Sequence, residues 1–388
     1  MKTGLYFHNA NNDRKLAYDL ENKEVKSLTA DYYDPTLPTL IYIHGWQNGS
    51  MKEGFTPSFD NPDDILGDIN YANIWKNPNA SVYGTDYTNI PTRSKKQPTD
   101  DSISYGTSIY KYRNHVSKSS QAWNIAVFDW VEYADESEVK DAEAKMWTVF
   151  GPQGIRKRKS DGSYTSDSEL KALGMGVAEA CALSIKEFMG NTFSGSEFRL
   201  AGHSLGGQMT AVVGKYLLDW NSIVPNRIEF LDPFWSNWSK DYLNGDWVGE
   251  RCRWYTQELY SRKYVAFTHY RSSLVTGSPF VGDANDEIND TAILVNLASW
   301  WTGDQTKKHT YVEDWYFSTL ANGQTVECKV NWWGRRRSTG YHGPSAAAPT
   351  GRILEMMRQN YRWTQVEGRR ETNSSSHWFE RKSGRSGT

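Results

Sequence analysis

One serine in this sequence lies in a pattern that favours nucleophilic chemistry. Residues 202–206 read Gly-His-Ser-Leu-Gly and fit G-x-S-x-G, with Ser204 at the centre. Where this pattern is functional, the serine lies on a strained turn between a strand and a helix, and the glycines let those elements approach closely. A chain with 31 glycines also produces the pattern by chance, so the context decides. Residues 198–201 predict the strand and residues 208–218 the helix. We therefore expect Ser204 to be a nucleophile rather than an idle serine in a glycine-rich turn.

A nucleophilic serine needs a base, and the base needs a carboxylate that orients it. In the strand–turn–helix setting the chain order is Ser, then Asp or Glu, then His. Asp232 directly follows a predicted strand at 227–231 and precedes Pro233. This position is the carboxyl end of a strand, where parallel sheets carry their sites. The sequence predicts Asp232 as the carboxylate; Glu229 is the weaker alternative because it lies in the middle of the strand.

The base must come from the histidines that follow the serine in the chain. Of the eight histidines, the four later ones are His269, His309, His342 and His377. The last two lie in a downstream turn and in a predicted tail. His269 ends a predicted core strand at 263–268, whereas His309 lies in a polar loop just before a predicted helix at 311–320. A base needs a position over the sheet edge, so we predict His309, with His269 as the alternative.

The elements around these residues alternate between strands and helices. This alternation predicts an α/β protein with a mostly parallel central sheet and helices on both faces. With the serine turn and the residue order, it indicates the α/β-hydrolase fold. We expect one domain over residues 1–350, with a small edge hairpin around residues 4–28. Polar insertions are expected near 47–121 and 150–168, the second an exposed hairpin or loop, followed by a loosely ordered tail at 351–388. The predicted strands are 39–43, 123–130, 198–201, 227–231 and 263–268, and the predicted helices are 170–189, 208–218 and 311–320.

Composition and charge narrow the function classes. The net charge is −2, so no overall field attracts nucleic acid. Apolar runs are all far shorter than about 18 residues, so no transmembrane segment is expected, and the first residues do not have the pattern of a signal peptide. Among the three cysteines, Cys181 lies in an apolar helical pattern and is expected in the core. Cys252 and Cys328 can form a disulfide or stay free, because sequence does not show the geometry of a bridge.

Six short segments, in the same order, resemble the pancreatic-lipase family and its phospholipases. They are similar to the family's oxyanion strand and turn, its next core strand, its nucleophile turn, its aspartate segment, its catalytic-histidine segment and the close of its catalytic domain. In this chain they are residues 41–46, 123–130, 202–207, 230–233, 308–318 and 338–342. Together they span roughly residues 36–345. Among the departures from the family are a much longer gap between residues 44 and 123 and the missing cysteine framework.

The resemblance implies a secreted ester hydrolase that works through an acyl-enzyme. Ser204, Asp232 and His309 would be its triad, and the backbone amides of Trp46 and Leu205 would hold the oxyanion. No cofactor or metal is expected; the acidic stretch at 282–290 lacks the spacing of a calcium loop. The expected partner is a lipid ester at a lipid–water interface, first of all a triacylglycerol. A phospholipase releasing the first acyl chain, a soluble esterase and a non-catalytic lipid-binding relative remain alternatives, and the oligomeric state stays open.

An apolar segment at 291–301 is the candidate lid. Most of its residues are apolar, including Leu294, Trp300 and Trp301, and it ends shortly before His309, where the resembling lipases place their lid. We expect a helix that covers the pocket when closed and meets lipid when open. A helix that is apolar on all sides is also typical of a buried element, and this alternative stays open.

Overall fold

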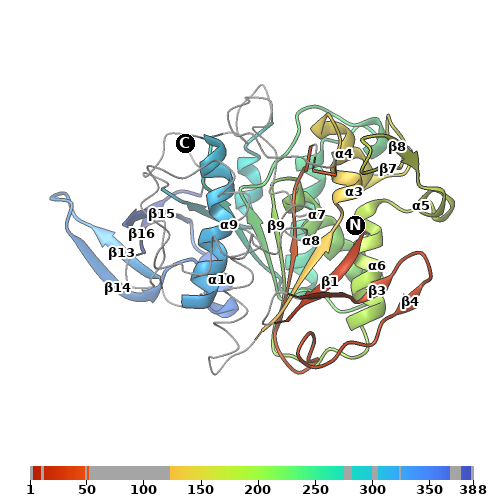
Figure 1. Cartoon of the computed structure of the whole chain (residues 1–388). Coiled ribbons are helices and arrows are strands. Elements are labelled where there is room, and N and C mark those ends of the chain that lie inside the picture. Colours follow the sequence, from red (N-terminus) through yellow and green to blue (C-terminus); the bar gives the residue numbers. More distant parts are fainter. Residues whose placement is uncertain are drawn as a thin grey trace.

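The fold centres on one large sheet, in which the described residues form 12 strands in the order β14-β13-β16-β15-β12-β11-β10-β9-β5-β6-β1-β2 (Figure 1). The structure, a computed structural model, describes residues 3–9, 13–48, 50–51, 123–274, 282–298, 305–322, 325–367 and 377–385. Most of the predicted insertion at 47–121 therefore lies outside the described residues.

The interior of the sheet is parallel. In the sheet order from β15 to β6, every pair of neighbouring strands is parallel. The six central strands are almost entirely buried, and β5 is a nearly continuous apolar run, as expected of a parallel strand with both faces covered. The six central strands are β6 (Asn124–Asp129), β5 (Thr39–Ile43), β9 (Phe198–His203), β10 (Arg227–Leu231), β11 (Ala266–Arg271) and β12 (Ile293–Asn296). The prediction of an α/β protein with a mostly parallel sheet is confirmed.

Helices cover both faces of this sheet. On one face, α7 packs against β9 and β10, and Gly214 of α7 lies close enough to Ile228 that a Cβ there would be 2.9 Å from the isoleucine Cδ1. On the other face, Trp315 of α9 packs on Tyr270 of β11, with ring centroids 5.2 Å apart. The helices are α3 (Val131–Ala134), α4 (Val139–Trp147), α5 (Ser168–Leu173), α6 (Val177–Met189), α7 (Leu205–Asp219), α8 (Val248–Lys263), α9 (Gln305–Asn322) and α10 (Thr350–Met357).

Short antiparallel strand pairs lie outside the parallel part of the sheet. The edge hairpin predicted around residues 4–28 is present as β1 (Gly4–His8) and β2 (Arg14–Leu16), and β3 (Tyr18–Asp19) pairs with β4 (Glu24–Val25). The insertion at 150–168 contains the hairpin of β7 (Arg156–Arg158) and β8 (Tyr164–Ser166).

Two cations of β7 form ion pairs with the domain, although the sequence predicted an exposed hairpin or loop here. Arg156 pairs with the buried Glu136 at 2.6 Å, and Lys157 pairs with Asp167 at 2.8 Å. Lys145 of α4 also pairs with Glu136 at 2.5 Å. The insertion is therefore docked on the domain through ion pairs.

The candidate lid segment contains a core strand, which corrects the prediction of a lid helix. Ile293–Asn296 is β12, between β11 and β15, and Leu294 is fully buried. β-branched residues on both sides of Leu294 favour the extended backbone, and a parallel strand covered on both faces has the same continuous apolar sequence as a buried helix. Trp300 and Trp301 lie outside the described residues.

The predicted tail is also wrong, because residues 351–388 contribute two strands to the central sheet. β15 (Tyr361–Glu367) pairs with β12, and β16 (Trp378–Ser383) lies between β15 and β13 (Val326–Val330). Alternating burial along β15 hides Trp363 and Gln365. These strands are polar on one side, so their sequence is hard to distinguish from a tail.

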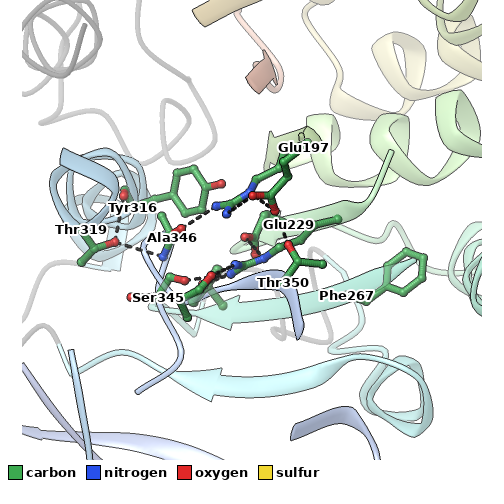
Figure 2. Close-up of polar contacts among 12 residues, drawn as sticks. Glu197, Glu229, Phe267, Tyr316, Thr319, Ser345, Ala346 and Thr350 are labelled. Carbon is green, nitrogen blue, oxygen red and sulfur yellow. Dashed lines mark hydrogen bonds and ion pairs between the residues drawn. The ribbon is translucent and has the colours of Figure 1, made fainter. Parts of the chain in front are cut away.

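A buried polar network fixes the segment that leads into α10 (Figure 2). Arg227 of β10 donates to the carbonyl oxygens of Ala348 and Ser345 at 2.8 and 2.9 Å. Arg199 of β9 donates to the carbonyl oxygen of Ala346 and pairs with Glu197 at 2.8 Å. Because both arginines are almost completely buried, these carbonyls replace water around the charges.

All three cysteines are buried and free, so Cys252 and Cys328, for which the sequence left both states open, do not form a disulfide. Cys252 lies on α8, whereas Cys328 lies on β13 near the far edge of the sheet. Cys181 is a core residue of α6, as predicted. No helix in the described part of the chain has both the length and the apolar character needed to cross a membrane.

Candidate active site

Ser204 lies on a sharp turn between β9 and α7, with φ = 54° and ψ = −122°. Few residues other than glycine adopt a positive φ, so the surrounding structure must impose it. The turn is fixed by hydrogen bonds from the Ser204 amide to the Leu231 carbonyl at 3.1 Å and from the Phe234 amide to the Ser204 carbonyl at 3.0 Å. A Cβ on Gly202 would be 2.1 Å from the Gly206 carbonyl oxygen. The two glycines of the motif are therefore required by the close approach of strand and helix.

Asp232 follows β10 and also has a positive φ, 41°. Its amide donates to the Tyr270 carbonyl at 2.8 Å, which turns the side chain toward the end of β11. There, the carboxylate accepts hydrogen bonds from the amides of Ser272 and Ser273 at 2.9 and 3.3 Å, and from the Ser273 hydroxyl. Burial raises the cost of ionising this carboxyl, but the hydrogen bond from His309 and those from the serines outweigh it and lower its pKa.

The structure brings His309 to this carboxylate. Its Nδ1 lies 2.7 Å from Oδ2 of Asp232, and both side chains are buried. A carboxylate only accepts, so the Nδ1 proton must point to Asp232, which leaves Nε2 of the neutral ring as an acceptor. Nε2 has no hydrogen-bond partner among the described residues. The imidazole is thus oriented, buried and able to take a proton.

The position of His309 in the fold differs from the predicted loop. Helix α9 begins at Gln305, so the histidine lies inside the helix. The residues before it are polar, and a polar sequence is typical of a loop as well as of the first turn of a helix. The ring of His203, the residue directly before Ser204, lies beside the ring of His309 with centroids 4.3 Å apart. The serine turn, the aspartate and α9 therefore meet at the carboxyl edge of the sheet.

The turn after β5 lies against the start of α7. A Cβ on Gly206 would be 2.1 Å from the Ile43 carbonyl oxygen. His44 fixes this turn: Trp130 donates its amide to Nε2 of His44 at 3.0 Å and its indole N–H to the His44 carbonyl at 2.8 Å. The indole N–H of Trp46 donates to the Glu136 carbonyl at 2.7 Å. Leu205 is the first residue of α7, and the first amides of a helix lack intrahelical partners.

A second imidazole–carboxylate pair lies behind His309, and sequence reasoning missed it. Nε2 of His203 lies 3.1 Å from the main-chain oxygen of His309, and Nδ1 of His203 lies 3.3 Å from Oε1 of Glu313. The hydroxyl of Tyr42 donates to the same Glu313 oxygen. The order Ser, Asp, His excludes His203 as the base, and no local pattern marks Glu313. The available signal was helical spacing, since residues 309 and 313 share one face of α9.

The alternative candidates face other partners. Nδ1 of His269 lies 3.0 Å from Oδ1 of Asn289, and burial, with the nearby Arg271, lowers its pKa to about 4. Glu229 forms a buried ion pair with Arg227, and burial raises its pKa. Neither contact involves the serine turn, so the structure assigns the carboxylate–imidazole contact to Asp232 and His309.

The arrangement places the strained turn of Ser204 beside a buried imidazole–carboxylate pair. Within the described ranges, no group of three or more His, Cys, Asp and Glu residues is placed to hold a metal ion. Comparison of the sequence with models of protein families gives no match, and comparison with curated proteins gives none either.

Proposed function

We propose that this protein is a serine ester hydrolase of the α/β-hydrolase fold, with lipid esters such as triacylglycerols as its substrates. The observation that carries the proposal is the buried hydrogen bond between His309 and Asp232 beside the strained turn of Ser204. A positive φ at a buried serine stores strain, and such strain persists mainly where it has a use. The lipid substrate and a secreted location rest on the resemblance to the pancreatic-lipase family.

In the proposed mechanism, Nε2 of His309 takes the proton of Ser204 as its oxygen attacks the ester carbonyl. Asp232 holds the imidazole in the required tautomer and stabilises the imidazolium that forms. The proton then passes to the leaving alcohol, and an acyl-enzyme remains. A water molecule, activated by the same imidazole, attacks the acyl-enzyme and releases the acid. A serine on a sharp strand-to-helix turn is also found in known hydrolases with this motif, which supports the proposal.

The backbone amides of Trp46 and Leu205 are the proposed oxyanion donors. In this fold, one donor follows the nucleophile and the other comes from the turn after an early strand. The close contact between Gly206 and the end of β5 supports this pairing, because it sets both segments beside the serine. Each such donor typically lowers the barrier by about 3 kcal/mol.

The test is Ser204→Ala, measured on triacylglycerol emulsions, phospholipid vesicles and short soluble nitrophenyl esters. We expect turnover to fall by roughly 10⁴-fold or more with the fold intact, and a fluorophosphonate probe to label the native chain but not the variant. Ser184→Ala is the matched control: it removes a buried serine hydroxyl that contacts only the Ala180 carbonyl among the described atoms. Labelling at another serine would contradict the proposal, and the substrate panel separates lipase, phospholipase and soluble esterase.

A further inference from the structure

The hairpin at one edge of the sheet carries two exposed tryptophans at its tip. β13 and β14 (Arg336–His342) pair antiparallel, and the hairpin extends away from the rest of the domain (Figure 1). Trp332 is 82% exposed and Trp333 is 67% exposed, with ring centroids 3.5 Å apart. A large apolar surface without a protein partner is typical of an interaction site.

The tip has a defined conformation that holds these rings outward. Oδ1 of Asn331 accepts hydrogen bonds from the amides of Trp333 and Arg335 at 3.1 and 2.9 Å. The Gly334 amide donates to the Asn331 carbonyl at 2.9 Å, and Gly334 has φ = 75°. This is the geometry of a short hairpin turn that needs glycine at the left-handed position. These hydrogen bonds therefore fix the backbone of the turn that carries the two exposed tryptophans.

Cations surround the tryptophans. Arg335 and Arg337 are exposed and have no ion-pair partner among the described residues, whereas Arg336 pairs with Glu367 at 2.9 Å. Lys329 lies directly opposite Arg337 across the hairpin. Two like charges facing each other destabilise a hairpin, so the fold itself gains nothing from them. A ligand with dense negative charge would relieve this repulsion.

We propose that the tip of the β13–β14 hairpin, residues 329–337, is an anchoring site for an anionic lipid surface. Tryptophan favours the boundary between apolar and wet surroundings, and arginine and lysine beside it pair with anionic headgroups. The tip projects outward, so it can enter a bilayer surface. A single-stranded nucleic acid requires a groove that follows its backbone, and the projecting tip offers none.

Binding by the hairpin is independent of the proposed catalysis, so the test uses the full chain with Ser204→Ala, which leaves vesicle lipids uncleaved. Co-sedimentation is measured with vesicles of phosphatidylcholine alone and of phosphatidylcholine mixed with phosphatidylglycerol, at low and high salt. We expect tighter binding to the anionic vesicles, weakened by salt. Replacing both Trp332 and Trp333 with Ala should weaken it at least about 10-fold. Arg335→Gln with Arg337→Gln should weaken it about 30-fold on the anionic vesicles only.

Trp254→Ala is the matched control, because this tryptophan is also exposed but lies on α8; its binding should not change. Equal binding by the double tryptophan variant and the parent chain would overturn the proposal. So would a self-association, seen by analytical ultracentrifugation, that the tryptophan substitutions abolish while vesicle binding is absent; that result would assign the tip to a second copy of the chain. Binding to single-stranded RNA but not to vesicles would assign it to nucleic acid and equally overturn the lipid assignment.

Discussion

Replacing Asp232 with Asn changes the hydrogen bonding of one buried side chain at almost constant volume. Oδ1 of the native carboxylate accepts from the amides of Ser272 and Ser273, and Oδ2 accepts from Nδ1 of His309. An asparagine has a single acceptor oxygen. If this oxygen faces the two amides, its NH₂ group faces Nδ1, which must then accept. The His309 proton moves to Nε2, the atom that takes the proton of Ser204 in the proposed mechanism.

The size of the effect follows from the alternative orientation of the amide. Turning the asparagine restores the useful tautomer but points its NH₂ group at two backbone donors. Each unsatisfied buried donor costs about 1–3 kcal/mol, so the turned form is a small minority. The blocked tautomer should then lower turnover by about 10⁴-fold, equivalent to about 5 kcal/mol in the barrier.

The assay is the initial rate on a soluble nitrophenyl ester, with the melting temperature measured in parallel. Asp286→Asn is the control, because it makes the same chemical change on a carboxylate that pairs with Arg271. We expect the control to keep nearly all of its turnover. If Asp232→Asn keeps more than about a tenth of the native turnover while remaining folded, the tautomer reasoning is wrong.

Three further outcomes follow from the buried groups. Glu313→Gln should lower kcat about 10-fold with little change in KM, because the pair with His203 positions the His309 main chain; a rise in KM alone would contradict this positioning role. Burial raises the pKa of Glu143 to about 7, so its native state holds a proton that the unfolded state loses first. Stability should therefore fall by about 3 kcal/mol as the pH rises from about 4.5 to 7, and urea denaturation of Glu143→Gln should show a flatter profile. The three thiols are buried and free, so a thiol reagent should modify none of them in the native protein and all three after denaturation.

Much of the site was predictable because its signals are local. The strand at 39–43 has the same bounds in the structure, since a buried parallel strand is a continuous apolar run. The glycines around Ser204 mark the close approach of strand and helix. Asp232 directly follows its strand, and residues at that edge converge in every parallel sheet.

The errors arose where the deciding interaction is distant in sequence. The run around Leu294 has the composition of both a helix and a strand, and its partner β15 lies some seventy residues later along the chain. The polar network of His203, Glu313 and Tyr42 joins three elements, so none of the three sequences shows it alone. Whether Cys252 meets Cys328 depends on the same long-range arrangement.

The order of strands at the far edge of the sheet affects how the chain can fold during its synthesis. β12 and β13 are close in the chain but are not neighbours in the sheet, because β15 and β16 lie between them. During synthesis, which proceeds from the amino terminus, β12 emerges with one edge open until β15, some seventy residues later, has left the ribosome. An open, apolar edge is a site for wrong pairing with other chains. The nascent protein is therefore exposed to aggregation throughout this interval, and the tryptophan hairpin can join the sheet only after β16 has emerged.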